Sequence, residues 1–204
     1  RMLALTLQLR EAGLPVVLVV NMMDEAEQQN VTVDIQRLAG ALGIPVVGAA
    51  ATVGRGVSEL RKILADGVHS SPPIEPVVKY LEPIERALGE VAALCGEIFD
   101  AQPLSRRTLS LLYLMDDADI VGLVEQQASP EVRARAAEIS QHLKEQLSAP
   151  VEYHVALALK QAAQRLAAVA VRDTAPGEGF GAALSRLMMR PLTGFPILIL
   201  VVYF

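Results

Sequence analysis

The chain has 204 residues, of which 52% are hydrophobic, and it carries a net charge of −5 with one cysteine and no tryptophan. This length allows one sizeable core or two small ones, and the negative charge argues against nucleic acid as a partner, because phosphate binding needs a basic face. The single cysteine, Cys95, excludes an internal disulfide framework and fits a reducing compartment.

The chain begins with a predicted helix over 2–12, which ends at Gly13 and Pro15. An uninterrupted aliphatic run over 16–20 follows. Such a run predicts a strand that is buried on both faces, as in a parallel sheet covered by helices.

The strand is followed by the tetrapeptide Asn21-Met22-Met23-Asp24. Ligands of parallel sheets bind at the carboxyl ends of the strands, which is where these residues fall. An amide and a carboxylate three residues apart can hold the edge of a guanine-like base, so the tetrapeptide is similar to the guanine-specificity motif of GTPases. Alternatively, Asn21 and Asp24 form only a turn and cap the next helix at Glu25.

The next elements repeat the α/β pattern. Asp34 predicts the start of a helix that runs to Leu42 and ends at Gly43, and 45–47 predicts a second short strand. A further helix is expected over 57–66. Its apolar face is formed by Val57, Leu60, Ile63 and Leu64.

A loop of small residues lies between that second strand and the last of these helices. Ala50, Ala51 and Thr52 resemble the fifth GTPase motif, in which backbone N–H groups approach the base, although Ala51 stands where Ser or Thr is usual. Strand, Asn-x-x-Asp, helix, strand, small-residue loop and helix together predict the C-terminal half of a P-loop GTPase domain, an α/β fold with parallel strands, over residues 1–68.

The phosphate-binding half of such a domain has no counterpart in the chain. It contains no Gly-x-x-x-x-Gly-Lys-Ser/Thr sequence, and no Asp-x-x-Gly follows an early strand to serve Mg²⁺. The chain also starts within a predicted helix. We therefore expect a fragment that neither hydrolyses GTP nor transports ions by itself.

The composition changes after residue 68. A Pro- and Ser-rich linker over 69–76 leads into an all-helical domain over 77–173. Its predicted helices cover 83–99, 105–115, 118–126, 131–147 and 151–171.

Chemically reactive groups are sparse in the helical domain. Asp116, Asp117 and Asp119 could bind a divalent cation, but they are also explained as a helix end followed by an N-cap. Cys95 falls on an apolar helix face and is expected to be buried. The histidines are scattered, so no metal site is expected.

The last residues indicate a membrane protein. A Gly-rich hinge leads into an amphipathic helix over 178–191, and an apolar run over 195–204 is interpreted as a transmembrane helix cut short. Arg172, Arg186 and Arg190 precede this run and would hold residues 1–190 in the cytoplasm. The alternative is a C-terminal strand of a soluble core.

The order of these parts resembles the bacterial ferrous iron transporter B family. The resemblance rests on Asn21 to Asp24, on the helical domain and on the Pro-x-x-Gly-x-Pro-Ile sequence over 191–197. It implies a cytoplasmic GTPase domain, a helical domain similar to a guanine-nucleotide-dissociation inhibitor, and a polytopic membrane domain. It further implies that Asn21 and Asp24 contact guanine, that Met22 packs beside the base, and that the loop at Ala50 supports it.

The function implied by this resemblance is GTP-dependent uptake of Fe²⁺ at the bacterial inner membrane. GTP would be the cofactor, with Mg²⁺ bound by residues that this chain lacks, and the lipid bilayer, small accessory transport proteins and further copies of the chain would be partners. Two alternatives stay open: a soluble regulatory GTPase with a helical partner-binding domain, and a non-catalytic interaction module.

Overall fold

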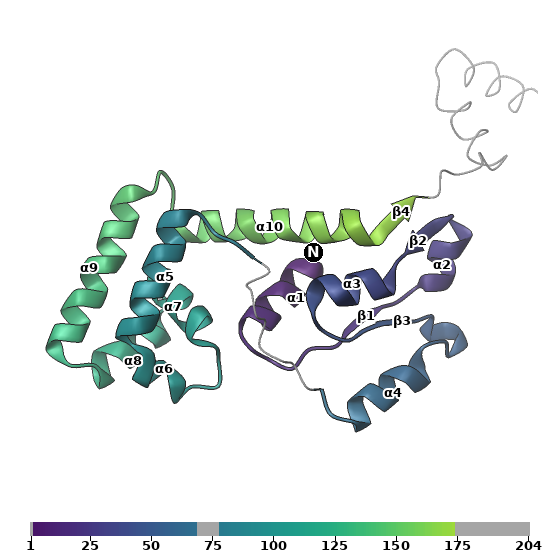
Figure 1. Cartoon of the computed structure of the whole chain (residues 1–204), viewed down its shortest axis with the longest axis horizontal. Coiled ribbons are helices and arrows are strands. Elements are labelled where there is room, and N and C mark those ends of the chain that lie inside the picture. The colour runs from purple at the N-terminus through teal and green to yellow at the C-terminus, as the bar shows by residue number, and fades with distance from the viewer. Residues whose placement is uncertain (1, 69–77, 174–204) are drawn as a thin grey trace, which may run out of the picture.

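The structure, a computed structural model, describes residues 2–68 and 78–173 (Figure 1). The elements of the first range are α1 Met2–Glu11, β1 Leu18–Val20, α2 Met23–Gln28, β2 Val31–Val33, α3 Ile35–Leu42, β3 Val46–Gly48, a helical turn over Ala51–Val53, and α4 Val57–Ala65. Those of the second range are α5 Glu82–Leu94, α6 Gly96–Asp100, α7 Arg106–Leu114, α8 Ala118–Gln127, α9 Pro130–Gln146, α10 Val151–Ala170 and β4 Val171–Asp173.

The first range contains the predicted parallel strand pair. β1 and β3 are hydrogen-bonded in parallel, with Leu18 opposite Val46 and Val20 opposite Gly48. The prediction that β1 is buried on both faces is wrong, because Val19 is 39% exposed and its neighbours in the strand are only half-buried. β1 has a single partner strand, β3, among the described residues.

α3, the helix that precedes β3, begins and ends as the sequence predicts. The side chain of Asp34 accepts a hydrogen bond from the backbone N–H of Arg37, and Gly43 ends the helix in the left-handed conformation at φ 62°. An N-cap acceptor and a left-handed glycine satisfy backbone groups that a helix leaves unpaired at its ends. Both boundaries of α3 are therefore determined by local residues.

A second strand pair was not predicted. β2 and β4 pair in antiparallel fashion, with Val31 opposite Asp173 and Val33 opposite Val171. The backbone N–H of Asp34 extends this ribbon by donating to the carbonyl of Ala170 at 2.8 Å. The ribbon joins the end of the helical domain to the segment between α2 and α3.

The helical range differs from the prediction at a second point, besides β4, which lies within the region predicted as all-helical. The single helix expected over 83–99 is two helices, α5 and α6, which meet at Cys95. Beside this break, the guanidinium of Arg106 on α7 lies 2.8 Å from where a Cβ would stand on Gly96. Cys95 itself is buried, as expected, and its burial raises the pKa of the thiol.

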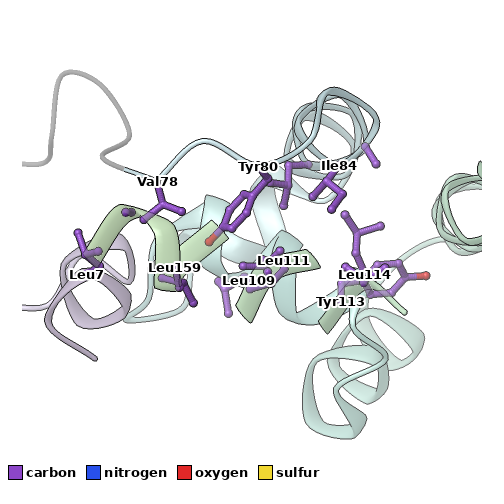
Figure 2. Packing of buried hydrophobic residues seen from close by; sticks show 14 of the residues in the cluster. Leu7, Val78, Tyr80, Ile84, Leu109, Leu111, Tyr113, Leu114 and Leu159 are labelled. Atoms are coloured by element: carbon purple, nitrogen blue, oxygen red, sulfur yellow. The ribbon is translucent and has the colours of Figure 1, made fainter. Parts of the chain in front are cut away.

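Both ranges share one hydrophobic core. α10 leaves the helical bundle and lies against α1 and α3 (Figure 1). Figure 2 shows Leu7 of α1, Tyr80, Leu109 of α7 and Leu159 of α10 within this cluster. Burial of such side chains is the main stabilising contribution to a fold, so α10 connects the α/β part to the helical part through packing.

The prediction of membrane segments concerns residues that the structure does not describe. The amphipathic helix over 178–191 and the apolar run over 195–204 lie outside the described residues. Within 2–68 and 78–173, no helix combines the length and the apolar character needed to cross a bilayer.

Candidate functional site

The predicted site lies where β1 and β3 end side by side. The backbone N–H of Ala49 donates to the carbonyl of Val20 at 2.8 Å, and the N–H of Met23 donates to the carbonyl of Ala49 at 3.0 Å. These bonds extend the strand pairing into the two loops that follow the strands. The tetrapeptide and the small-residue loop, which lie about 30 positions apart, are thereby fixed beside each other.

Side chains of the tetrapeptide reach across to the second loop. The Oδ1 atom of Asn21 accepts a hydrogen bond of 3.2 Å from the backbone N–H of Ala51. The hydroxyl of Thr52 lies 3.5 Å from Oδ2 of Asp24, at the outer limit of a hydrogen bond. Because the carbonyl oxygen of Asn21 faces Ala51, its NH₂ group faces away from that bond and can donate to a ligand.

The alternative interpretation of Asn21 as a helix cap does not fit this geometry. The N-cap of α2 is Met22, and no side chain caps this helix. Asp24 lies in the first turn of α2, where a carboxylate interacts favourably with the helix dipole. Asn21 therefore does not cap the helix, and its contact with Ala51 joins the two loops instead.

The two methionines of the tetrapeptide occupy different environments. Met22 has the left-handed conformation at φ 64° and is 53% exposed, so its thioether chain lies on the surface beside Asn21. Met23 is half-buried, and its Cγ lies 3.6 Å from where a Cβ would stand on Gly48. Met22 is thus placed to contact a ligand, whereas Met23 packs against the end of β3.

The second loop is closed by its own backbone. Ala50 is buried and exchanges two hydrogen bonds with Arg55, of 3.1 and 3.2 Å, so that residues 51–54 form the exposed tip. A Cβ at Gly56 would lie 2.4 Å from the carbonyl oxygen of Gly48, and Gly56 has φ 81°. Only glycine fits there, because both the close approach and the positive φ exclude a side chain.

One ion pair at the site was missed by the sequence analysis. Nη2 of Arg55 lies 2.7 Å from Oε1 of Glu27 on α2, with both side chains about half exposed. The hydrogen bond from Arg55 lowers the pKa of the Glu27 carboxyl, and the hydrogen bond to Glu27 raises the pKa of Arg55, with a smaller contribution from Asp24. The sequence shows Arg55 between two glycines, but it gives no sign that Glu27, which is distant in the chain, is the partner of Arg55.

The acidic cluster of the helical domain does not converge on a cation. Asp116 pairs with Lys144 at 2.7 Å, and Asp117 accepts hydrogen bonds from the backbone N–H groups of Asp119 and Ile120 as the N-cap of α8. In the part of the chain that the structure describes, no three His, Cys, Asp or Glu side chains come together as metal ligands. The capping alternative is therefore the one that the structure supports.

Two family models match most of the chain. One, described as ferrous iron transport protein B, matches residues 1–64, and the other, the FeoB cytosolic helical domain, matches residues 80–172. The chain belongs to the ferrous iron transport protein B family. The resemblance inferred from the sequence is thereby confirmed.

Individual relatives agree with this family. The chain is 32% identical to the Fe(2+) transporter FeoB of Salmonella choleraesuis and 31% identical to that of Escherichia coli K12, over 211 aligned residues in each case. These matches cover 100% of this chain but 25% of each relative. The chain thus spans about a quarter of the length of these transporters.

Solved structures of the family share the fold. The mGMPPNP-bound NFeoB from S. thermophilus superposes with a TM-score of 0.65 at 24% identity, covering 83% of this chain and 62% of that one. The cytosolic domain of the T. maritima FeoB iron transporter in its GMPPNP form gives 0.62 at 22% identity, covering 84% and 62%. The predicted fold class, a P-loop GTPase-like part with parallel strands followed by a helical domain, is confirmed.

Proposed function

We propose that Asn21, Met22 and Asp24 read the guanine base of GTP, supported by the loop over Ala50, Ala51 and Thr52. The observation that carries this proposal is the bond from the Ala51 N–H to Asn21 Oδ1, because it orients the amide with its donor side outward. The structural relatives bound to guanine nucleotide analogues, named above, give independent support.

The chemistry of the two polar side chains matches guanine. Guanine presents O6 and N7 as acceptors on one edge, which the NH₂ group of Asn21 can satisfy. Its N1–H and N2–H groups are donors, which the carboxylate of Asp24 can accept as a charge-assisted pair. Adenine presents an unprotonated N1 to that carboxylate, so two acceptors would face each other and binding would be weakened.

The residues present fit the base of GTP and no further part of it. GTP supplies the phosphates whose hydrolysis drives a conformational change in proteins of this type. We assign no residue of this chain to the phosphates or to Mg²⁺, since the sequence contains no phosphate-binding loop. What this chain contributes is recognition and orientation of the base.

We infer that the larger function is GTP-dependent uptake of Fe²⁺, with Fe²⁺ as the transported substrate. The relatives' name, Fe(2+) transporter FeoB, favours this over a soluble regulatory GTPase. In this proposal residues 1–68 are the GTPase segment, 69–76 the linker and 77–173 the helical domain. Residues 178–191 are the juxtamembrane helix and 195–204 enter the inner membrane, with 1–190 on the cytoplasmic side.

Asp24→Asn in the 204-residue chain tests the assignment of the base-reading residues. Nucleosides are the appropriate probes, because base recognition needs no phosphate contact. We expect the wild-type chain to bind guanosine at least about tenfold more tightly than adenosine, a difference of about 1.4 kcal/mol. In Asp24→Asn this preference should move to xanthosine, whose 2-oxo group can accept a bond from the new amide. Ligand-detected NMR titration measures all three affinities.

A matched variant separates this effect from general damage. Asp117→Asn changes the same functional group at the N-cap of α8, remote from the two loops. It should leave the preference for guanosine unchanged. Equal affinity of the wild-type chain for guanosine and adenosine would contradict the proposal, and so would an Asp24→Asn variant that keeps the wild-type order of affinities.

A further inference from the structure

The ion pair between Arg55 and Glu27 connects the two elements that form the proposed guanine site. Arg55 closes the small-residue loop, and Glu27 lies on α2, the helix whose first turn carries Asp24. Their side-chain atoms are 2.7 Å apart. The pair therefore connects the small-residue loop to α2.

The backbone of Arg55 is bonded next to the residue that contacts Asn21. Arg55 and Ala50 exchange two backbone hydrogen bonds, and Ala51, which follows Ala50, donates its N–H to Asn21. A movement of Arg55 relative to α2 would thus displace Ala51 relative to Asn21. The side-chain pair with Glu27 opposes that movement.

The tip of the loop before Arg55 is weakly held, although backbone bonds close the loop at its base. Gly54 and Gly56 flank Arg55 with φ of 74° and 81°. Gly56 is held by its close approach to Gly48, but a Cβ at Gly54 would meet nothing within 4 Å, and glycine rotates more freely than other residues, so the chain is weakly held on that side. Val53 at the tip is 71% exposed, and packing of the tip therefore gives little further support.

We propose that Arg55 and Glu27 are a positioning pair for guanine recognition: their ion pair holds the Ala51 N–H against Asn21 and so keeps the base-reading amide oriented. This inference rests on the function proposed above. Neither residue contacts the base in this account. Arg55 also lies close enough to Asp24 for their charges to interact, which places the pair at the edge of the site.

Amide hydrogen exchange of the full 204-residue chain tests the pair without any nucleotide. In Glu27→Gln and Arg55→Gln, the N–H of Ala51 should exchange about two- to fivefold faster than in the wild type, the range expected when an exposed ion pair is lost. Arg55→Lys keeps the charge and should stay within about twofold of the wild type. Raising the salt concentration should accelerate exchange in the wild type and have little effect in the two glutamine variants.

Glu138→Gln is the matched control. Glu138 forms an exposed ion pair of 2.6 Å with Arg135 on α9, far from the two loops. This variant should leave the exchange of Ala51 unchanged. In the same samples, the affinity for guanosine should fall about two- to fivefold in Glu27→Gln and Arg55→Gln but not in Glu138→Gln. Circular dichroism melts should stay the same, which separates positioning from general stability.

The outcomes distinguish this inference from the function on which it rests. Unchanged exchange of Ala51 in both Glu27→Gln and Arg55→Gln would overturn the positioning pair, whatever the nucleosides do. Faster exchange of Ala51 with unaltered guanosine affinity would also overturn it, because the loop would then move without consequence for the base. A wild-type chain that does not distinguish guanosine from adenosine would overturn the proposed function itself.

Discussion

Arg107 of α7 is bonded through its guanidinium to both α1 and α5. Its guanidinium donates to Glu11 on α1 at 2.7 Å, to both carboxylate oxygens of Glu85 on α5 at 2.7 and 2.8 Å, and to the carbonyl of Val78 at 3.3 Å. It also lies 5.2 Å from the ring centroid of Tyr80, whose hydroxyl donates to Glu11. A guanidinium is planar and has five N–H donors, so it can bind several carboxylate and carbonyl oxygens at once.

Replacing Arg107 by Gln should therefore be costly. Glu11 is 11% exposed at its side chain, and its carboxylate would lose the cation with which it is paired. Breaking a buried pair costs about 3–5 kcal/mol, and partial exposure reduces this to about 2–3 kcal/mol. Urea unfolding measures the loss. Arg86→Gln, which removes an exposed ion pair with Glu82, should leave urea unfolding nearly unchanged; equal losses for the two variants would contradict this expectation.

The same cluster makes stability depend on pH. Burial acts to raise the pKa of the Glu85 carboxyl, but hydrogen bonds from Arg107 and from the Tyr80 N–H outweigh it and hold that pKa below its ordinary value of 4.5. A lowered pKa stabilises the fold above the unfolded-state value, and this contribution is lost as the pH falls through the folded-state pKa. Urea midpoints should therefore drop below about pH 4.5, and less steeply in Glu85→Gln than in the wild type.

Individual residues were predictable where their signal is local. Asp34 and Gly43 were identified as caps, and Asn21 and Asp24 as residues at a strand end, because each depends on its immediate neighbours in the sequence. The partners of Arg107 were not predictable. Glu11 is 96 positions away from it, and no periodicity of the sequence relates the two.

At the scale of elements, α3 and α4 have similar apolar stripes but different environments. Leu42 of α3 is fully buried, whereas Leu64 of α4 is 57% exposed and no residue of α4 is buried. Leu42→Ala should cost about 2–5 kcal/mol through the cavity it leaves. Leu64→Ala should change the free energy of unfolding by less than about 0.5 kcal/mol. If urea unfolding showed similar losses of stability for Leu42→Ala and Leu64→Ala, the exposed position of Leu64 on α4 would be contradicted.

The elements that the sequence analysis missed are short or depend on distant partners. Val31-Thr32-Val33 is a β-branched triplet with alternating burial, bounded by Asn30 and Asp34, and that pattern could have predicted β2. β4 has no such local signal, since it continues directly from α10. The break between α5 and α6 was not recognisable from helical periodicity, because the apolar spacing of Val91, Cys95 and Ile98 continues across it.

At the scale of the whole molecule, stability should be distributed unevenly. Most of the buried hydrophobic side chains belong to the helical domain, including α10, whereas β1 and β3 form a parallel pair of three residues each. Two-stranded sheets are marginal by themselves. Hydrogen-exchange mass spectrometry should show fast exchange in residues 16–20 and slow exchange in α5, α7 and α10. Protection of 16–20 equal to that of α5 would contradict this expectation.

The ribbon of β2 and β4 is the point at which a force applied at the end of the described chain would act on the α/β part. α10 has 20 residues, about 30 Å of helix, and it carries the chain away from the bundle before β4 pairs with β2. A pull on the backbone at Asp173 would act on this ribbon, and through β2 on α2, which contacts β2. The end of the described chain is thus connected, through β4 and β2, to α2, the helix that carries Asp24.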